Sequence, residues 1–244
     1  MEENINVMGY PIFIGNISSL PLDNKSKTII ATINPHSYVT AKTDPDFKKA
    51  LLTSNFLVPD GSGIVLAAKQ AYKTNIKKVS GADLHQYLLE DLNEKGGKCF
   101  YMGASKKTLR IIHEKISVDF PNIEVETYSP PFKDNFTDEE NRKIISQVNL
   151  FEPDILFIGM TAPKQEKWLI KHKDDLTFKV AVPIGAVFDF YAGTIARPST
   201  FWISLHLEWF ARLMKEPKRL WKRNFVSTPL FLIDMMLFKI GLKK

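Results

Sequence analysis

Residues 56–63 read Phe-Leu-Val-Pro-Asp-Gly-Ser-Gly, a short apolar run that stops at a carboxylate held between a proline and two glycines. The run predicts a buried strand, and Pro59 ends it because proline has no N–H to give to a sheet ladder. Gly61 and Gly63 permit a tight turn or the close approach of a ligand. Asp60 would then lie at the carboxyl edge of a sheet, where open α/β sheets bind ligands. An aspartate in this setting is also an ordinary turn residue, so the stretch alone leaves both interpretations open.

Apolar runs alternate with helical patterns along most of the chain. Buried strands are predicted at residues 12–14, 28–33, 56–59, 99–102, 123–128, 155–158 and 180–184. Helices are predicted at residues 44–54, 64–72, 81–93 and 106–120, and further helices are predicted to begin at Thr137 and Pro163. Continuous apolar strands separated by helices are typical of a mainly parallel sheet covered by helices on both faces. The sequence therefore predicts an α/β fold.

Charge is spread unevenly over the 244 residues, 44 % of which are apolar. Residues 197–244 hold ten Lys or Arg against three acids, whereas residues 1–196 hold 23 bases and 24 acids. We therefore predict a core domain at 1–196, large enough to bury a core, and a basic appendage at 197–244. The N-terminus is acidic and lacks a long apolar run, so we expect no signal peptide and a cytoplasmic protein.

Several common sites are excluded by spacing. Leu66 stands where a dinucleotide fingerprint beginning at Gly61 needs its third small residue, and no Gly-Lys-Ser/Thr follows a glycine-rich turn. The five histidines form no close ligand pair, and the single cysteine, Cys99, lies in an apolar run that favours a buried thiol. Asp44-Pro45-Asp46 matches the Asp-x-Asp with which many sugar-transferring enzymes hold a metal, but a helix cap followed by proline explains it better. We therefore expect no metal and no cofactor.

Polar residues follow several of the predicted strands. Because parallel strands end at the same edge of a sheet, these side chains are expected to converge. A turn of small residues between a strand and a helix can also seat a phosphate on free N–H groups, although it is ordinary strand-to-helix geometry as well. The polar residues are Thr32, Asn34, Asp60, Ser105, Thr161, Lys164 and Gln165, and the turn of small residues begins at Gly103.

Six short motifs stand in order along the chain. They are Thr32-Ile33-Asn34-Pro35, Pro59-Asp60-Gly61-Ser62-Gly63, Gly81-Ala82-Asp83-Leu84, Pro163-Lys164-Gln165-Glu166-Lys167-Trp168, Gly185-Ala186-Val187-Phe188-Asp189 and Glu208-Trp209-x-x-Arg212-Leu213. In this order, and over nearly the whole chain, they resemble the WecG/TagA/CpsF glycosyltransferases. The resemblance implies a Rossmann-like core that moves a sugar, an N-acetylhexosamine such as N-acetylmannosamine, from a UDP-sugar to a polyprenyl-pyrophosphate-linked saccharide. It further implies inversion at the anomeric carbon without a metal, in the synthesis of teichoic acid or another cell-surface polysaccharide.

The same resemblance assigns roles to individual residues. Asp60 is implied to be the general base that takes the proton from the acceptor hydroxyl, with Thr32 beside it. Where relatives often carry arginine, this chain has Lys78, which cannot make the bidentate phosphate contact of a guanidinium. The implied substrate-binding residues are Asn34, Gly61, Gly63, Lys78, Asp83, Gly103, Ser105, Thr161, Lys164, Gln165, Arg212, Arg219 and Arg223.

The basic appendage carries the pattern of a membrane-surface helix. Trp202, Leu205, Trp209 and Leu213 form one apolar stripe at helical spacing. The apolar run at 229–238 is too short for a spanning helix, so we expect it to lie in the membrane interface. Each basic residue near an anionic leaflet adds roughly 1 kcal/mol of attraction. Alternatively, the stripe packs on the core. The resemblance implies that arginines of this appendage reach the pyrophosphate.

Other functions remain open at this point. A UDP-hexose transferase of capsule or exopolysaccharide synthesis is the main alternative, because the sequence does not separate the donors. A nucleic-acid-binding protein with a basic tail is disfavoured, since aliphatic residues dominate the tail and the core is slightly acidic. We expect an enzyme on the inner face of the cell membrane, and a homo-oligomer is left open.

Overall fold

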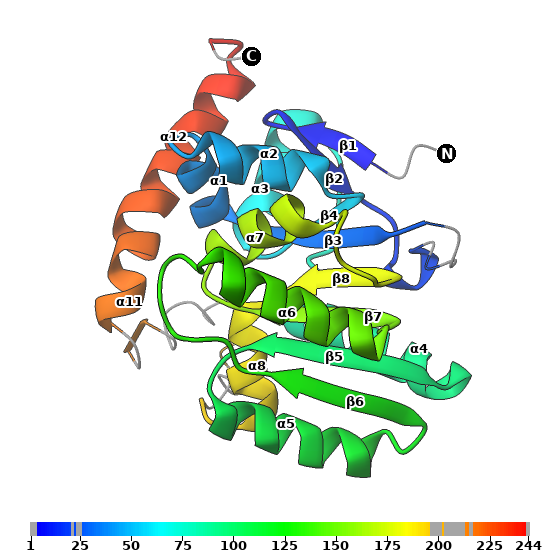
Figure 1. The fold of residues 1–244 in the computed structure, drawn as a ribbon. Coiled ribbons are helices and arrows are strands. Elements are labelled where there is room, and N and C mark those ends of the chain that lie inside the picture. Colours follow the sequence, from blue (N-terminus) through cyan, green and yellow to red (C-terminus); the bar gives the residue numbers. More distant parts are fainter. Residues whose placement is uncertain are drawn as a thin grey trace.

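The computed structural model describes residues 4–20, 22, 26–195, 202, 213–214 and 217–242 (Figure 1). It confirms the α/β fold. An eight-stranded sheet runs through the molecule in the order β1-β2-β4-β3-β8-β7-β5-β6, and β2 to β8 pair in parallel while β1 pairs antiparallel with β2. The strands are β1 (Asn4–Val7), β2 (Tyr10–Phe13), β3 (Thr28–Ile33), β4 (Phe56–Pro59), β5 (Gly97–Gly103), β6 (Ile123–Tyr128), β7 (Ile155–Gly159) and β8 (Val180–Pro183).

Helices cover both faces of the sheet, as the sequence predicts. Side chains of α4, α5 and α8 share a buried apolar cluster on one face, and those of α1, α2, α3, α6 and α7 form two clusters on the other. The core helices are α1 (Pro35–Ala41), α2 (Pro45–Thr53), α3 (Ser62–Tyr72), α4 (Gly81–Lys95), α5 (Lys106–Asp119), α6 (Asp138–Phe151), α7 (Lys164–His172) and α8 (Gly185–Ala192), with a 3-10 turn η1 (Ile17–Ser19).

The predicted helix caps explain where these helices begin. The Asp44 carboxylate accepts a hydrogen bond from the Phe47 N–H at 2.9 Å and another from Lys167 Nζ at 2.9 Å, which confirms that Asp44-Pro45-Asp46 starts α2. Thr137 caps α6 in the expected box, accepting from the Glu140 N–H at 3.3 Å. Each cap satisfies an N–H that has no partner within its own helix.

Helix α1 and strand β1 are among the elements that the sequence does not predict. The segment from Asn34 was interpreted as the end of a strand, yet α1 begins there, with Asn34 as its cap and Pro35 at its first position. Strand β1 is short and pairs only with β2 at the edge of the sheet. Both elements have few residues, so neither shows a clear period in the sequence.

The C-terminal part continues as α11 (Pro217–Lys222), a π-helical turn η2 (Arg223–Ser227) and α12 (Thr228–Lys239). In Figure 1 these helices lie along the side of the sheet toward which the carboxyl ends of the strands point, and α12 contacts α1 and α3. The predicted boundary at residue 197 falls outside the described residues, as do Leu205 and Trp209 of the predicted stripe, so the division into two domains stays a prediction.

Candidate functional site

Asp60 lies where β4 turns into α3. Its backbone N–H donates to the Ile33 carbonyl at 2.8 Å, so strands β3 and β4 stay paired up to the carboxylate itself. The side chain is half-buried. Gly61 follows with φ +101°, a conformation that side chains rarely adopt, and it is the residue before α3 begins. The turn that holds Asp60 at the sheet edge therefore requires glycine at position 61.

Gly63 allows three helices to meet beside this turn. A Cβ on Gly63 would collide with the Pro35 ring of α1 and lie 3.5 Å from Phe231 of α12. The sequence predicts a tight turn or the close approach of a ligand at Gly63, and the groups that approach it in the structure are helices α1 and α12. Its contact with a substrate stays a prediction.

Thr32 and Asn34 come from the neighbouring strand, β3. Thr32 pairs with Val58 in the sheet and is half-buried. Because side chains alternate along a strand, Thr32 lies on the same face as Ile30, the face covered by α4 and α8. Asn34 Oδ1 accepts from the N–H groups of His36 and Ser37, each at 3.0 Å, and so caps α1.

The segment before α4 runs alongside Asp60. The Val79 N–H donates to the Pro59 carbonyl at 3.0 Å, which places Lys78 one residue from a direct contact with the end of β4. Asp83 and Ser80 cap α4 reciprocally. The Ser80 N–H donates to Asp83 Oδ2 at 3.1 Å, and the Asp83 N–H donates to Ser80 Oγ at 3.2 Å.

The loop after β7 supplies Thr161, and the first turn of α7 supplies Lys164 and Gln165. Thr161 is exposed, and its carbonyl accepts from the Lys164 N–H at 3.0 Å. Lys164 Nζ donates to the Lys133 carbonyl and lies over the Phe136 ring, and burial lowers its pKa. Gln165 is 5 % exposed, and its Oε1 accepts from the Gly185 N–H at 3.1 Å. β7, β8, β3 and β4 are adjacent, so these residues lie on the same sheet edge as Asp60.

Gly103 and Ser105 lie farther along that edge, after β5. A Cβ on Gly103 would collide with the backbone of Gly159, so the glycine lets two strand ends approach. Ser105 Oγ accepts from the Thr108 N–H at 3.1 Å and caps α5. Ser129 Oγ donates to the Ala104 carbonyl at 2.8 Å and ties the end of β6 to this turn. These contacts serve the fold, and phosphate binding here stays a prediction.

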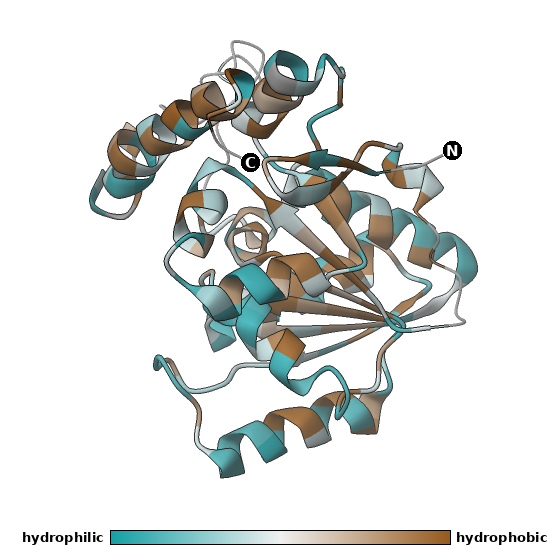
Figure 2. Cartoon of the chain, turned by 90° about the horizontal axis from the view of Figure 1, so that it is seen from above, coloured by the Kyte–Doolittle hydropathy of each residue, from teal (hydrophilic) through white to brown (hydrophobic). Residues whose placement is uncertain are grey.

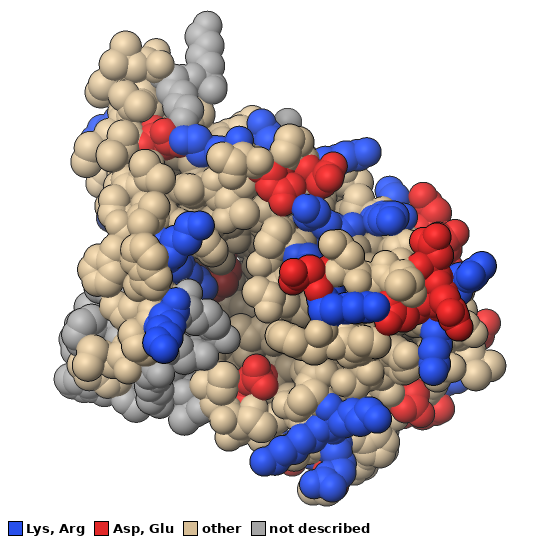
Figure 3. All heavy atoms as spheres, turned by 60° about the vertical axis from the view of Figure 1, so that its left-hand side comes forward, with Lys and Arg blue, Asp and Glu red and all other residues tan. Residues whose placement is uncertain are grey.

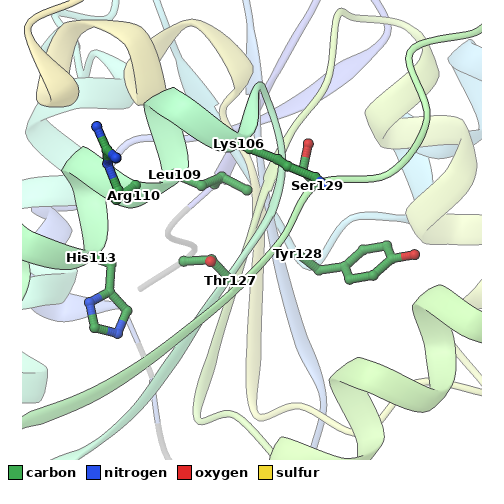
Figure 4. A pocket seen from close by; sticks show the side chains of 7 residues that line it. All are labelled: Lys106, Leu109, Arg110, His113, Thr127, Tyr128 and Ser129. Carbon is green, nitrogen blue, oxygen red and sulfur yellow. The ribbon is translucent and has the colours of Figure 1, made fainter.

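An open groove of about 430 Å³ adjoins the same turn, between α5 and β6 (Figure 4). In the close-up, Lys106 and Ser129 lie together at one end, Leu109 and Thr127 occupy the middle, and Tyr128 points the opposite way from Thr127. Arg110 and His113 complete the lining on α5, so the groove is basic and separate from Asp60.

The C-terminal helices bind the core through polar as well as apolar contacts. His36 Nδ1 lies 2.8 Å from Ser227 Oγ. The carboxylate of Asp234, 5 % exposed, accepts from Tyr38 Oη at 3.1 Å and from Lys42 Nζ at 2.6 Å. These contacts fix α12 and η2 on α1, the helix that Asn34 caps.

Arg223 is the appendage arginine that the structure places. Burial, and then the positive charges of Arg223 and Lys222, lower the pKa of His36, so both cations lie near the first turn of α1. Arg212 lies outside the described residues, as does the side chain of Arg219. In Figure 3, Lys and Arg side chains of the C-terminal helices border a hollow between these helices and the core, and an acidic side chain lies inside it.

The appendage also exposes apolar side chains, and hydrophobic residues colour much of its helices brown in Figure 2. Phe231 and Met235 of α12 are buried against the core, whereas Ile233 is 54 % and Met236 60 % exposed. The other exposed apolar residues of this surface are Trp221, Phe225, Val226, Leu230, Ile240 and Leu242. Within the described ranges, every helix is too short or too polar to cross a bilayer. The described residues also contain no group of three or more His, Cys, Asp or Glu placed to hold a metal.

Three features of this site escaped the sequence analysis. His36 and Ser227 are single polar residues far apart in sequence, and no local pattern joins them. Asp234 stands within the apolar run at 229–238, and nothing in the local sequence indicates that its carboxylate is buried. Glu166, 5 % exposed, is the third: in sequence it looks like a solvated residue of a first helical turn.

Comparison with known proteins finds, over almost the entire chain, the same family that the six sequence motifs resemble. The family model described as "Glycosyl transferase WecG/TagA/CpsF family" matches residues 4–244. Two enzymes named N-acetylglucosaminyldiphosphoundecaprenol N-acetyl-beta-D-mannosaminyltransferase, from Bacillus spizizenii and Bacillus subtilis, are each 30 % identical over 224 residues, or 92 % of this chain and 84 % and 85 % of theirs. The enzyme of the same name from Staphylococcus aureus strain MW2 is 25 % identical over 215 residues, 88 % of this chain and 82 % of its own.

Proposed function

Because the chain belongs to the WecG/TagA/CpsF family of glycosyltransferases, we propose that it transfers N-acetylmannosamine from a UDP-sugar to N-acetylglucosaminyl-diphosphopolyprenol. The observation that carries the proposal is the similarity, over 92 % of the chain, to two enzymes whose names state this sugar and this acceptor. The product would serve the synthesis of teichoic acid or a related surface polymer.

The sheet edge supports a single-displacement reaction with inversion. The acceptor hydroxyl attacks the anomeric carbon, its oxygen forms the new glycosidic bond, and the bond from that carbon to the UDP oxygen breaks. Asp60, half-buried at the end of β4, takes the hydroxyl proton. A base in this position contributes about 10²–10⁴-fold to the rate. Thr32, on the strand beside it, borders the same reacting centre.

Cations and N–H dipoles would stabilise the departing pyrophosphate, because charge develops there in the transition state. Lys78 lies on the segment bonded to the end of β4, and Lys164 follows β7 on the same edge. Arg223 approaches the first turn of α1 from the appendage. We propose that these groups act in place of a metal ion.

The exposed apolar residues of the appendage supply the attachment to the membrane. Apolar side chains beside basic ones are typical of helices that lie in a membrane interface. Ile233 and Met236 would enter the interface, and basic residues of α11 would contact anionic headgroups. The enzyme would thus meet a lipid-linked acceptor at the inner face of the membrane.

A screen of radiolabelled UDP-sugars against defined polyprenyl-diphosphate acceptors tests this function. We expect transfer from UDP-N-acetylmannosamine to the N-acetylglucosamine-bearing acceptor, an inverted anomeric configuration by NMR, and activity that persists in EDTA. Transfer from a UDP-hexose alone would replace the donor with that of a capsule or exopolysaccharide enzyme. Absence of transfer from every UDP-sugar would refute the proposal.

A further inference from the structure

Gln165 and Glu166 form a buried polar pair where α7 begins. Each is 5 % exposed. Gln165 Oε1 accepts from the Gly185 N–H at 3.1 Å, and Gln165 Nε2 donates to Glu166 Oε1 at 2.9 Å. Two hydrogen bonds in series therefore join the turn between β8 and α8 to the first turn of α7.

The chemistry of the partners fixes the orientation of the Gln165 amide. The Gly185 N–H can only donate, so it requires the amide oxygen, and the amide nitrogen must then point to an acceptor. Glu166 supplies that acceptor. With an apolar side chain at position 166, the Gln165 NH₂ group would be buried without this partner, at a cost typical of a lost buried hydrogen bond.

The turn that receives this contact has little room to adjust. A Cβ on Gly185 would collide with the Met160 carbonyl and lie 2.8 Å from Gln165 Oε1. On its other side, the turn meets α4: a Cβ on Gly81 would lie 3.2 Å from Val187 and 3.4 Å from Ile184. A shift at Gly185 would therefore be passed to the start of α4, which carries Asp83 and follows Lys78.

We propose that Glu166 is a positioning residue, which holds Gln165 on Gly185 and thereby fixes the β8–α8 turn at the same edge of the sheet as Asp60. This inference deepens the proposed function and rests on it for its effect on turnover. The second oxygen, Glu166 Oε2, is buried without a hydrogen-bond partner among the described residues. A buried oxygen without a hydrogen bond lowers the stability of a fold. A gain in stability therefore does not account for a carboxyl at position 166, whereas the hydrogen bond that Oε1 accepts from Gln165 does.

Four full-length variants test the proposal. Glu166→Leu removes the acceptor, whereas Glu166→Gln keeps one, because its amide can present its oxygen to Gln165. Gln165→Glu keeps the acceptor for Gly185 but removes the NH₂ donor whose hydrogen bond Glu166 Oε1 accepts. The double variant Gln165→Glu/Glu166→Gln restores one donor and one acceptor in reversed order. Circular dichroism shows which variants fold before they are compared.

The first readout is hydrogen exchange at the start of α8, which needs no substrate. We expect exchange about tenfold faster in Glu166→Leu and Gln165→Glu, as for one lost buried hydrogen bond. Exchange should be no faster in Glu166→Gln than in the wild type, and it should return to the wild-type rate in the double variant. Wild-type exchange in Glu166→Leu would overturn the proposal, and so would fast exchange in the double variant. If Glu166→Leu does not fold, the Gln165→Glu and double variants decide the question alone.

The second readout is kcat and KM for the UDP-sugar. If Gln165 acts through position, the double variant recovers most of the about tenfold loss in kcat/KM expected for Gln165→Glu. If the Gln165 NH₂ instead binds the substrate directly, the double variant regains exchange protection without activity, and positioning is refuted. A wild-type protein that transfers no sugar contradicts the proposed function alone, since the exchange results still confirm or refute the contact.

Discussion

Replacing Glu166 with glutamine should stabilise the fold above pH 7 and leave it nearly unchanged at pH 4.5. Burial raises the pKa of the Glu166 carboxyl from 4.5 to about 7, opposed by weaker hydrogen bonds from the Gln165 amide and from its own backbone N–H. The side chain is 5 % exposed, so water screens its charge little. The folded protein therefore keeps this proton to a higher pH than the unfolded chain does.

The sign of the effect follows from proton binding. Between pH 4.5 and pH 7 the folded state binds more protons at Glu166 than the unfolded state, so the free energy of unfolding falls as the pH rises through this window. The rise of the pKa from 4.5 to about 7 corresponds to about 3 kcal/mol of stability, present below pH 4.5 and lost above pH 7. Glutamine resembles the neutral acid in shape and does not titrate, so the variant does not lose this stability.

Urea denaturation followed by circular dichroism at pH 5, 6, 7 and 8 measures the difference between the two proteins. The free energy of unfolding of Glu166→Gln should exceed that of the wild type by an amount that grows to about 3 kcal/mol at pH 8. Glu94→Gln, at an exposed glutamate of α4, is the matched control and should show no such growth. A difference between Glu166→Gln and the wild type that is the same at pH 5 and pH 8 would refute a buried, titrating Glu166.

Three further changes test the rest of the site. Asp60→Asn should lower kcat by about 10²–10⁴-fold while calorimetry still detects UDP binding, and near-normal turnover would remove Asp60 as the base. Lys42→Met should lower the free energy of unfolding by about 3 kcal/mol, because it removes a cation that lies 2.6 Å from the buried Asp234 carboxylate. Asp234→Asn should lower it less, because the Lys42 side chain is 41 % exposed and water can solvate its charge; equal losses in urea denaturation would contradict this. Ile233→Asp should weaken flotation with anionic liposomes without unfolding the protein. Val118→Asp, at an exposed position of α5, is the control and should leave flotation unchanged. Equal flotation of both variants would exclude the outer face of α12 as the membrane contact.

Local signals were enough to predict most of the sheet and its helix caps. Continuous apolar runs such as residues 155–158 form central strands because both faces of a parallel sheet are covered. Asp44 and Ser105 cap helices because their side chains reach N–H groups two or three residues ahead, a purely local interaction. Asp60 falls at the sheet edge for an equally local reason, since Pro59 ends the strand and Gly61 makes the turn.

Features that depend on distant contacts could not be predicted in this way. Helix α1 has seven residues and is held by α12 and η2, which lie almost 200 positions farther along the chain. Glu166 has the charge of a surface residue, and only the assembled fold shows that α7 buries it. The appendage was expected either to face the membrane or to pack on the core. The structure shows that α12 packs on the core and keeps a second, exposed apolar face.

The two faces of α12 together explain how a carboxylate in the core could meet a substrate that stays in a bilayer. The inner face packs on α1 and α3, the two helices that begin just after Asn34 and Asp60. Phe231 lies 3.5 Å from the position of a Cβ on Gly63, three residues beyond Asp60. If the outer face rests in the membrane interface, Asp60 stands roughly one helix diameter, about 10 Å, from that surface. A pyrophosphate and one sugar span a comparable length, so the acceptor hydroxyl of the proposed reaction would reach Asp60 while its lipid remains in the membrane.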